Sequence, residues 1–327
     1  MARIVLGLGT SHSPQLSAPP EAWPRFGEND KNNPELLDGN GDCHPYAEFL
    51  ETADPALRKQ LTPEVWRAKW ERCQAGIAWV GRRLAEVKPD VLVIVGDDQE
   101  ELFHDENTPA LLVYWGEQVL NTPRVYPAHV PAPVRDAGWG YGVKAETFPG
   151  APELGRHLIE TFIDGEFDVA HSRELKPDRG VGHAFGFVYH RLFDGRPIPT
   201  LPVMVNTYYP PNQPTPKRCY EIGRVIREAV ESWHRDARVA VLGSGGLSHF
   251  IINEELDSEL LEAMRVGDGE RIYSVPRKLL NSGTSECRNW IVAAGASAEL
   301  SMHLHDYIPC YRSPAGTGCA MAFADWT

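Results

Sequence analysis

Three histidines stand where the chain leaves a predicted strand or passes through a glycine-rich turn. His12 lies in GTSHSP, His183 in RGVGHAFGF and His249 in GSGGLSHFIINEELD. The short apolar runs before His12 and His249 are typical of buried strands, and functional side chains often lie in the loops that follow such strands. An acidic pair, Glu254 and Glu255, comes shortly after His249. An imidazole and a carboxylate at the end of a buried strand predict an active site.

These residue types favour metal chemistry. Two neutral imidazoles and one carboxylate on one face of an ion leave coordination positions open, which suits non-heme Fe(II) working on oxygen. Histidines after turns also occur simply as hydrogen-bonding residues, and this reading has comparable weight for His12 and for His183 taken alone. His44 in GDCHPY and the acidic stretch GDDQEELFHDEN are further candidates. Single loop histidines and charge runs are, however, usually solvated.

Strands and helices alternate along the chain, which predicts an α/β fold. Apolar runs predict strands at 4–8, 91–95, 110–114, 167–170, 201–205 and 239–242. Apolar residues at helical spacing predict helices at 62–89, 154–162, 222–233, 256–264 and 285–294. No repeat or linker interrupts this pattern. We therefore expect residues 1–327 to form a single domain, with a central mixed sheet flanked by helices and the site at the strand ends.

Residues 14–55 form a long stretch without clear periodicity. The stretch is rich in proline, glycine, asparagine and aspartate. Loops longer than about 12–15 residues within a compact domain are usually functional or disordered. We therefore expect this segment to cover the site.

Composition excludes several classes of function. The 327 residues are 42% hydrophobic and 24% charged, which is enough for a sizeable core. The formal net charge of −13, without clustered lysine and arginine, disfavours a nucleic-acid partner and favours a small-molecule substrate.

No apolar run approaches membrane-spanning length, and the N-terminal run is too short for a signal peptide, so we expect a cytoplasmic protein without a membrane partner. Six scattered cysteines without a C-x-x-C pair argue against a structural zinc site and a disulfide framework.

Several ordered motifs carry a resemblance to a known family. GTSHSP, VGHAFGF, VNTYYPP, GSGGLSHFIINEELD and YRSPAGTG follow one another along the chain. In this order they resemble the class III extradiol ring-cleavage dioxygenases, the protocatechuate 4,5-dioxygenase β-subunit superfamily. The resemblance extends from residue 3 to about residue 325 and is closest to the branch that includes 3-O-methylgallate dioxygenases.

The resemblance implies roles for individual residues. His12 falls on the first iron ligand and Glu255 on the carboxylate ligand. His249 falls on the histidine that acts as acid and base, and His183 on the second active-site histidine. The second histidine ligand of the family has no direct counterpart, because Gln99 occupies its position.

Three residues are candidates for this missing ligand. Gln99 can bind through its amide oxygen, although an amide is a poorer donor to Fe(II) than imidazole. His44, in the long N-terminal segment, is favoured, with Gln99 beside or behind it. His104 is the third candidate.

The resemblance also implies a reaction. The chain would use Fe(II) and O2 for extradiol cleavage of a catecholic aromatic acid such as 3-O-methylgallate, gallate or protocatechuate. In the protocatechuate enzyme a Ser-Asn pair holds the ring carboxylate, and here Gly316 and Thr317 occupy those positions. Thr317 can donate one hydrogen bond, and Arg312 can add a charge-assisted one.

Two other functions remain open. In a metal-dependent hydrolase, His12, His44 and Glu255 would hold zinc and an activated water. In a non-catalytic relative, the glutamine at position 99 would have abolished iron binding. The sequence leaves the oligomeric state open, including a homo-oligomer.

Overall fold

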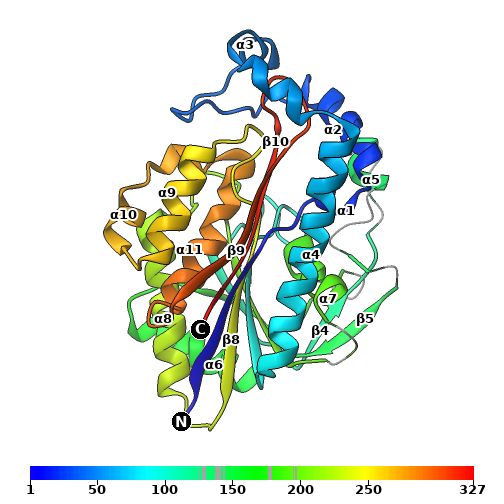
Figure 1. Ribbon diagram of the computed structural model, residues 1–327. Coiled ribbons are helices and arrows are strands. Elements are labelled where there is room, and N and C mark those ends of the chain that lie inside the picture. The colour runs from blue at the N-terminus through cyan, green and yellow to red at the C-terminus, as the bar shows by residue number, and fades with distance from the viewer. Residues whose placement is uncertain are drawn as a thin grey trace.

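The computed structural model describes residues 1–124, 126, 130–136, 141, 142, 144–175, 179–193, 195 and 197–327. These residues form the predicted α/β fold, with one mixed eight-stranded sheet between layers of helices (Figure 1). The strands are β1 (Arg3–Thr10), β2 (Val91–Gly96), β3 (Leu111–Tyr114), β4 (Gln118–Asn121), β5 (Glu146–Pro149), β6 (Ala170–Ser172), β7 (Thr200–Val205), β8 (Arg238–Ser244), β9 (Met302–Tyr311) and β10 (Gly318–Trp326). The order in the sheet is β6-β3-β7-β2-β8-β1-β10-β9, while β4 and β5 form a separate hairpin.

The centre of the sheet is parallel. β1, β8, β2 and β7 lie side by side and run in the same direction. All residues of β2 and β7 are buried, as expected for parallel strands covered on both faces. Thr10 pairs with Ser244, and Val95 pairs with Gly243. The carboxyl ends of these strands therefore meet at one edge of the sheet.

The flanks of the sheet contain antiparallel pairs. β10 runs antiparallel to β1, β9 runs antiparallel to β10, and β3 runs antiparallel to β7. The apolar runs do not predict β9, because buried and half-exposed residues alternate irregularly along it. The β3 strand pairs in parallel with the short β6.

Helices cover both faces of the sheet. The α-helices are α1 (Pro14–Ser17), α2 (Trp23–Asp30), α3 (Tyr46–Thr52), α4 (Pro63–Val87), α5 (Ala132–Asp136), α6 (Pro152–Asp164), α7 (His183–Arg191), α8 (Pro216–Ser232), α9 (Glu254–Arg265), α10 (Gly269–Ser274) and α11 (Cys287–Ala296), with short 3-10 helices η1 (Pro20–Ala22), η2 (Pro55–Gln60), η3 (Arg277–Leu280) and η4 (Ser282–Glu286). In the parts of the chain that the structure describes, no helix has both the length and the apolar character needed to cross a membrane.

Alternate residues of β2 belong to two separate cores. Val93 and Val95 pack in a core with α6, α8 and α11, whereas Leu92 and Ile94 pack in a core with α4 and α7. This follows from the two-residue period of a strand, which sends successive side chains to opposite faces. Burial on both sides holds the strand end rigidly in place.

The longest helix, α4, is the one that the sequence indicates most clearly. The Thr62 side chain accepts a hydrogen bond from the Val65 backbone N–H at 3.4 Å, and Pro63 occupies the first turn. The helix ends where Lys88 adopts a left-handed conformation with φ of 50°, directly before Pro89. The buried stripe of α4 packs on the sheet, so this helix is structural.

The N-terminal segment 14–55 contains short helices where the sequence predicts a loop. These are α1, η1, α2 and α3, and Figure 1 shows α1, α2 and α3 beyond the carboxyl ends of the parallel strands. Each helix is too short to show a clear apolar period. The Ser13 side chain caps α1 by accepting a hydrogen bond from the Leu16 N–H at 2.9 Å.

Candidate active site

Four buried side chains meet at the carboxyl edge of the parallel strands. They are His12, Asp97, His183 and Glu286, and one potential ligand atom from each lies within 4.8 Å of all the others. His12 lies just past β1, Asp97 directly follows β2, His183 is the first residue of α7, and Glu286 ends η4 immediately before α11. Imidazoles and carboxylates gathered in this way can hold a divalent metal ion.

Ser244 fixes which ring nitrogen of His12 carries the proton. The Ser244 hydroxyl donates to the Ala184 carbonyl at 2.8 Å, so its oxygen accepts from the His12 Nδ1–H at 2.9 Å. The Nε2 atom of His12 therefore faces the cluster, 3.5 Å from Glu286 Oε2. An imidazole held by Nδ1–H with Nε2 directed inward is the form that ligates metals.

His183 is oriented by a buried carboxylate. Its Nδ1 donates to Glu101 Oε2 at 2.9 Å, and its backbone N–H donates to the same carboxylate at 3.0 and 3.1 Å. Arg124 also donates to Glu101, at 2.8 Å. A side chain at Gly182 would collide with Glu101, so this contact requires glycine there. The rings of His183 and His12 lie edge to face, with centroids 4.8 Å apart.

Charge balance in the cluster favours a protonated His183. Burial lowers the pKa of His183, but Glu101 in direct contact, together with Asp97 and Glu286, outweighs burial and raises the pKa to about 9. Burial also raises the pKa of Glu101, but His183 and Arg124 reverse this and hold it below its ordinary value. The site is therefore built to carry compensating charges.

The pKa values of the two carboxylates of the cluster are shifted in opposite directions. Burial raises the pKa of Glu286, but the surrounding His12, His249 and His183 outweigh it and lower the pKa to about 2. Burial and the neighbouring Glu286 raise the pKa of Asp97. Glu286 is therefore the anionic member of the pair, and a metal ion bound here would have to displace any proton on Asp97.

The glycine run before His249 brings Glu286 into the site. The Gly246 N–H donates to Glu286 Oε2 at 2.6 Å, and Trp290 Nε1 donates to the Gly245 carbonyl at 2.7 Å. A Cβ atom on Gly245 would stand 2.9 Å from the Glu286 Cβ, which is too close. The missing side chain therefore lets the start of α11 approach the end of β8.

His249 lies beside the cluster as a neutral base. Its Nδ1 donates to the Leu247 carbonyl at 2.7 Å, so Nε2 carries the lone pair and lies 3.9 Å from Glu286 Oε1. Burial lowers the pKa of His249, although Glu286 opposes this. The ring is thus able to accept a proton at neutral pH.

The cluster opens into a cavity of about 460 Å³, within the range typical of small-molecule sites. His12, His249, Gln99 and Glu286 are among the residues that line it. The wall supplied by the N-terminal segment 14–55 consists of Pro14, Gln15, Phe26, Asn29, Asp30, Asn32, Asn33, Pro34 and Glu35. This segment therefore forms part of the cavity, as a covering segment would.

Comparison with known proteins places this geometry in a family. Residues 55–317 match the family described as the catalytic LigB subunit of aromatic ring-opening dioxygenase. The chain belongs to this LigB family. The resemblance to ring-cleaving dioxygenases seen in the sequence motifs is thus confirmed at the level of the family.

Curated relatives of this LigB-family chain are named as dioxygenases. Gallate dioxygenase of Pseudomonas putida is 28% identical over 185 residues, which cover 52% of each protein. The 2,3-dihydroxyphenylpropionate/2,3-dihydroxicinnamic acid 1,2-dioxygenase of Photorhabdus laumondii is 35% identical over 94 residues, 29% of this chain and 28% of the relative. The enzyme of the same name from Comamonas testosteroni is 27% identical over 164 residues, 50% of this chain and 44% of the relative. The matches span about half or less of these relatives.

The structure does not bring Glu255 to the LigB-family site. Asn253 caps α9 by accepting from the Leu256 N–H at 3.0 Å, so Glu255 lies exposed in the first helical turn. Its neighbour Glu254 accepts a hydrogen bond from the Tyr311 hydroxyl at 2.7 Å. The carboxylate that stands beside the histidines is Glu286 instead.

Two of the three candidates for the missing ligand also lie apart from the cluster. His44 is half-exposed, and its ring nitrogens contact Glu48 at 2.9 Å and Asp38 at 3.4 Å. His104 lies 3.0 Å from Arg179 Nη1. Gln99 is the one sequence candidate that reaches the cluster, where it contacts both carboxylates through its amide nitrogen.

Two of the proposed substrate contacts do not line the cavity. Thr317 is buried and its hydroxyl donates to Ser313 Oγ at 2.7 Å, while Gly316 turns the backbone with φ of 80°. Arg312 does line the cavity, but its Nε and Nη2 atoms both donate to Asp30 at 2.7 Å. Its Nη1 atom donates to Gln15 at 3.0 Å. Arg312 is thus already paired with a carboxylate of the protein.

The sequence patterns miss Asp97, Glu101 and Glu286. Asp97 directly follows a buried strand, so the rule that selected His12 could have found it. Glu101 lies in an acidic run of the kind that is usually solvated, although the structure buries it. No local sequence pattern marks Glu286 as a site residue, because it reaches the histidines only through the packing of α11 against β8.

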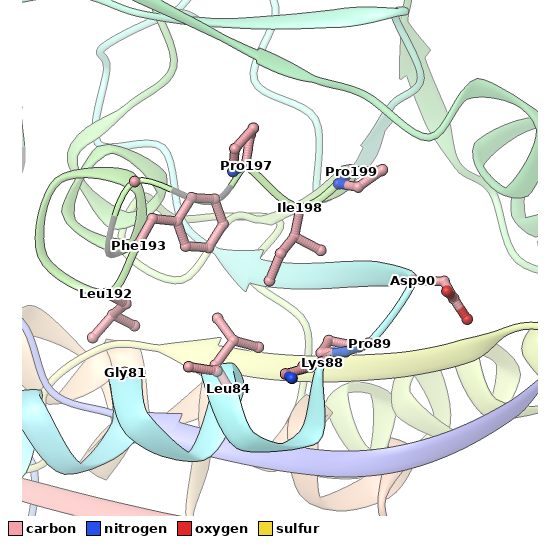
Figure 2. Close-up of a pocket in the computed structure, with 12 residues that line it drawn as sticks. Gly81, Leu84, Lys88, Pro89, Asp90, Leu192, Phe193, Pro197, Ile198 and Pro199 are labelled. Atoms are coloured by element: carbon pink, nitrogen blue, oxygen red, sulfur yellow. The ribbon is translucent and has the colours of Figure 1, made fainter.

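A second cavity, of about 560 Å³, is distant from this chemistry. It lies next to the amino end of β2, between the end of α4 and the segment before β7. Leu84 and Ile198 point toward each other across it (Figure 2). Among the described residues that line it there is no histidine, cysteine or glutamate. We therefore assign the chemistry to the cavity above the histidines.

Proposed function

We propose that this chain is an extradiol dioxygenase, which uses Fe(II) and O2 to open the ring of a catecholic aromatic compound next to its two hydroxyl groups. The observation that carries the proposal is the buried His12, His183 and Glu286 group with the neutral His249 beside it. Two imidazoles and one carboxylate with open positions suit non-heme Fe(II) oxygenases. Membership of the LigB family supports the same reaction.

The donor set fits such an ion. Nε2 of His12 faces the cluster because Nδ1 donates to Ser244. Because Nδ1 of His183 donates to Glu101, Nε2 is the ring atom of His183 that would bind the ion, which would displace the proton that His183 otherwise carries. Glu286 supplies the anionic oxygen, and Asp97 offers a second carboxylate in the same group. In this assignment Glu286 replaces Glu255, and His183, which the resemblance gives as the second active-site histidine, acts as a ligand.

The chain's own residues transfer the proton and exclude water from the substrate ring. When bound, the ion supplies a Lewis acid that lowers the pKa of the substrate hydroxyls and a binding position for O2. His249 Nε2 accepts a proton from the substrate and later returns it, a role that suits a neutral imidazole. The apolar Phe26, Val134 and Phe250 line the cavity and exclude water around the ring.

For the substrate we propose a carboxylated catechol of the gallate, 3-O-methylgallate or protocatechuate type. Support comes from Arg312 in the cavity wall and from the gallate dioxygenase relative. One N–H on each of Nη1 and Nη2 of Arg312 remains for a substrate carboxylate after Asp30 and Gln15 are satisfied. A cytoplasmic location belongs to the same proposal, and the six free cysteines are consistent with it.

The test is anaerobic reconstitution of the purified chain with Fe(II), followed by addition of O2 and a panel of catechols. We expect stoichiometric O2 uptake and a yellow ring-opened product with at least one carboxylated catechol. A chain that binds zinc and hydrolyses a substrate without O2 would favour the hydrolase alternative. A chain that binds neither metal would favour the non-catalytic alternative.

A further inference from the structure

Gln99 lies between the two carboxylates of the cluster. Its Nε2 atom is 2.9 Å from Asp97 Oδ2 and 3.2 Å from Glu286 Oε1. Both partners are acceptors, so the amide must present its NH2 group to them, and the opposite rotamer of the amide would place oxygen against oxygen. Both N–H groups of Gln99 are therefore used. The end of the amide that contacts the two carboxylates is therefore its nitrogen, which donates hydrogen bonds and does not bind a cation.

The contact joins two distant parts of the chain. Asp97 follows β2, while Glu286 precedes α11, and Gln99 and Glu286 are 187 residues apart in sequence. The remaining oxygens are also held, since Asn289 donates to Asp97 Oδ1 at 3.1 Å and the Gly246 N–H donates to Glu286 Oε2 at 2.6 Å. Gln99 supplies the link between the two carboxylates.

Such a link has a clear physical role. Two carboxylates in one buried group repel each other when both are ionised, and a shared neutral donor lowers this cost and fixes their spacing. A metal ion needs both groups in place when it arrives. Groups that hydrogen-bond to ligands typically contribute 10–100-fold to metal affinity.

We propose that Gln99 is a positioning residue, which holds Asp97 and Glu286 in the arrangement that binds the metal ion, and that it is not itself a ligand. The inference rests on the proposed metal centre. It assigns a function to the glutamine at the position where the sequence resemblance implies a histidine ligand.

The test measures Fe(II) affinity anaerobically by competition with a chromophoric chelator, for the wild type, Gln99→Met and Gln99→Glu. Methionine keeps the length of the side chain but has no N–H group. We expect Gln99→Met to raise the Kd for Fe(II) about 10–100-fold. Gln99→Glu separates the two roles. If position 99 supplied a ligand, the new carboxylate would keep or increase the affinity, whereas a position that must donate hydrogen bonds loses affinity with glutamate.

A matched control is Gln74→Met on α4. Gln74 is also half-buried, and its amide donates to the Leu16 carbonyl at 2.9 Å, away from the cluster. This variant should bind Fe(II) with the wild-type Kd. The melting temperature of each metal-free variant shows whether Gln99→Met weakens Fe(II) binding by destabilising the fold. If Gln99→Met is unstable, the Kd of Gln99→Glu for Fe(II) decides the question instead.

The outcomes distinguish the two proposals. If the wild type itself does not bind Fe(II), the metal centre of the proposed function fails and the role of Gln99 fails with it. If the wild type binds and Gln99→Met binds equally well, or Gln99→Glu binds more tightly, only the positioning role is overturned.

Discussion

Glu101 and His183 form a buried carboxylate–imidazole pair at the start of α7. One carboxylate accepts hydrogen bonds from both the backbone N–H and the Nδ1–H of His183. The side chains of Glu101 and His183 are only 6% and 3% exposed, so solvent screens the pair little. The pair fixes the ring so that Nε2 is directed at the cluster, as in the carboxylate–histidine–metal arrangements of metalloenzymes.

Replacing Glu101 tests this orientation. Glu101→Gln keeps the shape but removes the charge that holds the imidazole, so the affinity for Fe(II) should fall about 10–100-fold. The measurement is anaerobic chelator competition. Glu117→Gln, at an exposed position, is the control and should bind as the wild type does. Unchanged affinity in Glu101→Gln would show that His183 is not a ligand.

His249 provides the second prediction. Burial lowers its pKa below the ordinary value of 6.5, so the ring is neutral at pH 7 and becomes protonated only as the pH falls through this lowered pKa. Ring cleavage should therefore lose activity on the acidic side below pH 6.5. His249→Asn should reduce kcat about 10²–10⁴-fold while the Kd for Fe(II) stays near the wild-type value. Loss of Fe(II) binding in this variant would contradict the role as a base.

Asp98 gives a prediction about stability and pH. Burial, with the nearby Glu101, raises its pKa to about 7 from 3.8. Between these two pKa values the folded state therefore keeps the proton on Asp98, whereas the unfolded state has released it. The stabilising contribution is complete below the unfolded pKa and disappears as the pH rises through 7.

We therefore expect Asp98→Asn, which can still accept from the Leu102 and Phe103 N–H groups, to raise the melting temperature at pH 8. At pH 4 the variant should melt close to the wild type. Thermal melts of both metal-free proteins across this pH range are the measurement. If the melting temperatures of the variant and the wild type differed by the same amount at both pH values, the raised pKa of Asp98 would be contradicted.

The pair of Asp30 and Arg312 gives the fourth prediction. Both side chains are almost fully buried, and the two hydrogen bonds at 2.7 Å make the contact bidentate. Removing one partner leaves an uncompensated buried charge, so Asp30→Asn should lower the free energy of unfolding by about 3–5 kcal/mol. The double variant with Arg312→Met should recover much of this loss. Urea unfolding of the single and double variants checks the coupling, and additive losses would disprove it.

The sequence by itself determined the framework that leads to the site. The apolar runs at 91–95 and 239–242 were long enough to identify buried strands, and the caps of α4 marked its ends. His12, His183 and His249 could be selected because each follows a strand or a glycine turn. Local patterns suffice here because strand burial and helix capping depend on neighbouring residues. The family motifs added the chemistry that spacing alone cannot supply.

Only the tertiary structure decided which carboxylates complete the site. Glu255 is close to His249 in sequence, yet the start of α9 directs it to solvent, whereas Glu286 reaches the histidines because the glycines after β8 allow α11 to approach. Similarly, Glu101 lies in an acidic run but is buried against His183, and Gln99 contacts two carboxylates from different elements. Contacts between distant segments depend on how helices pack against a sheet, and no local pattern records that packing.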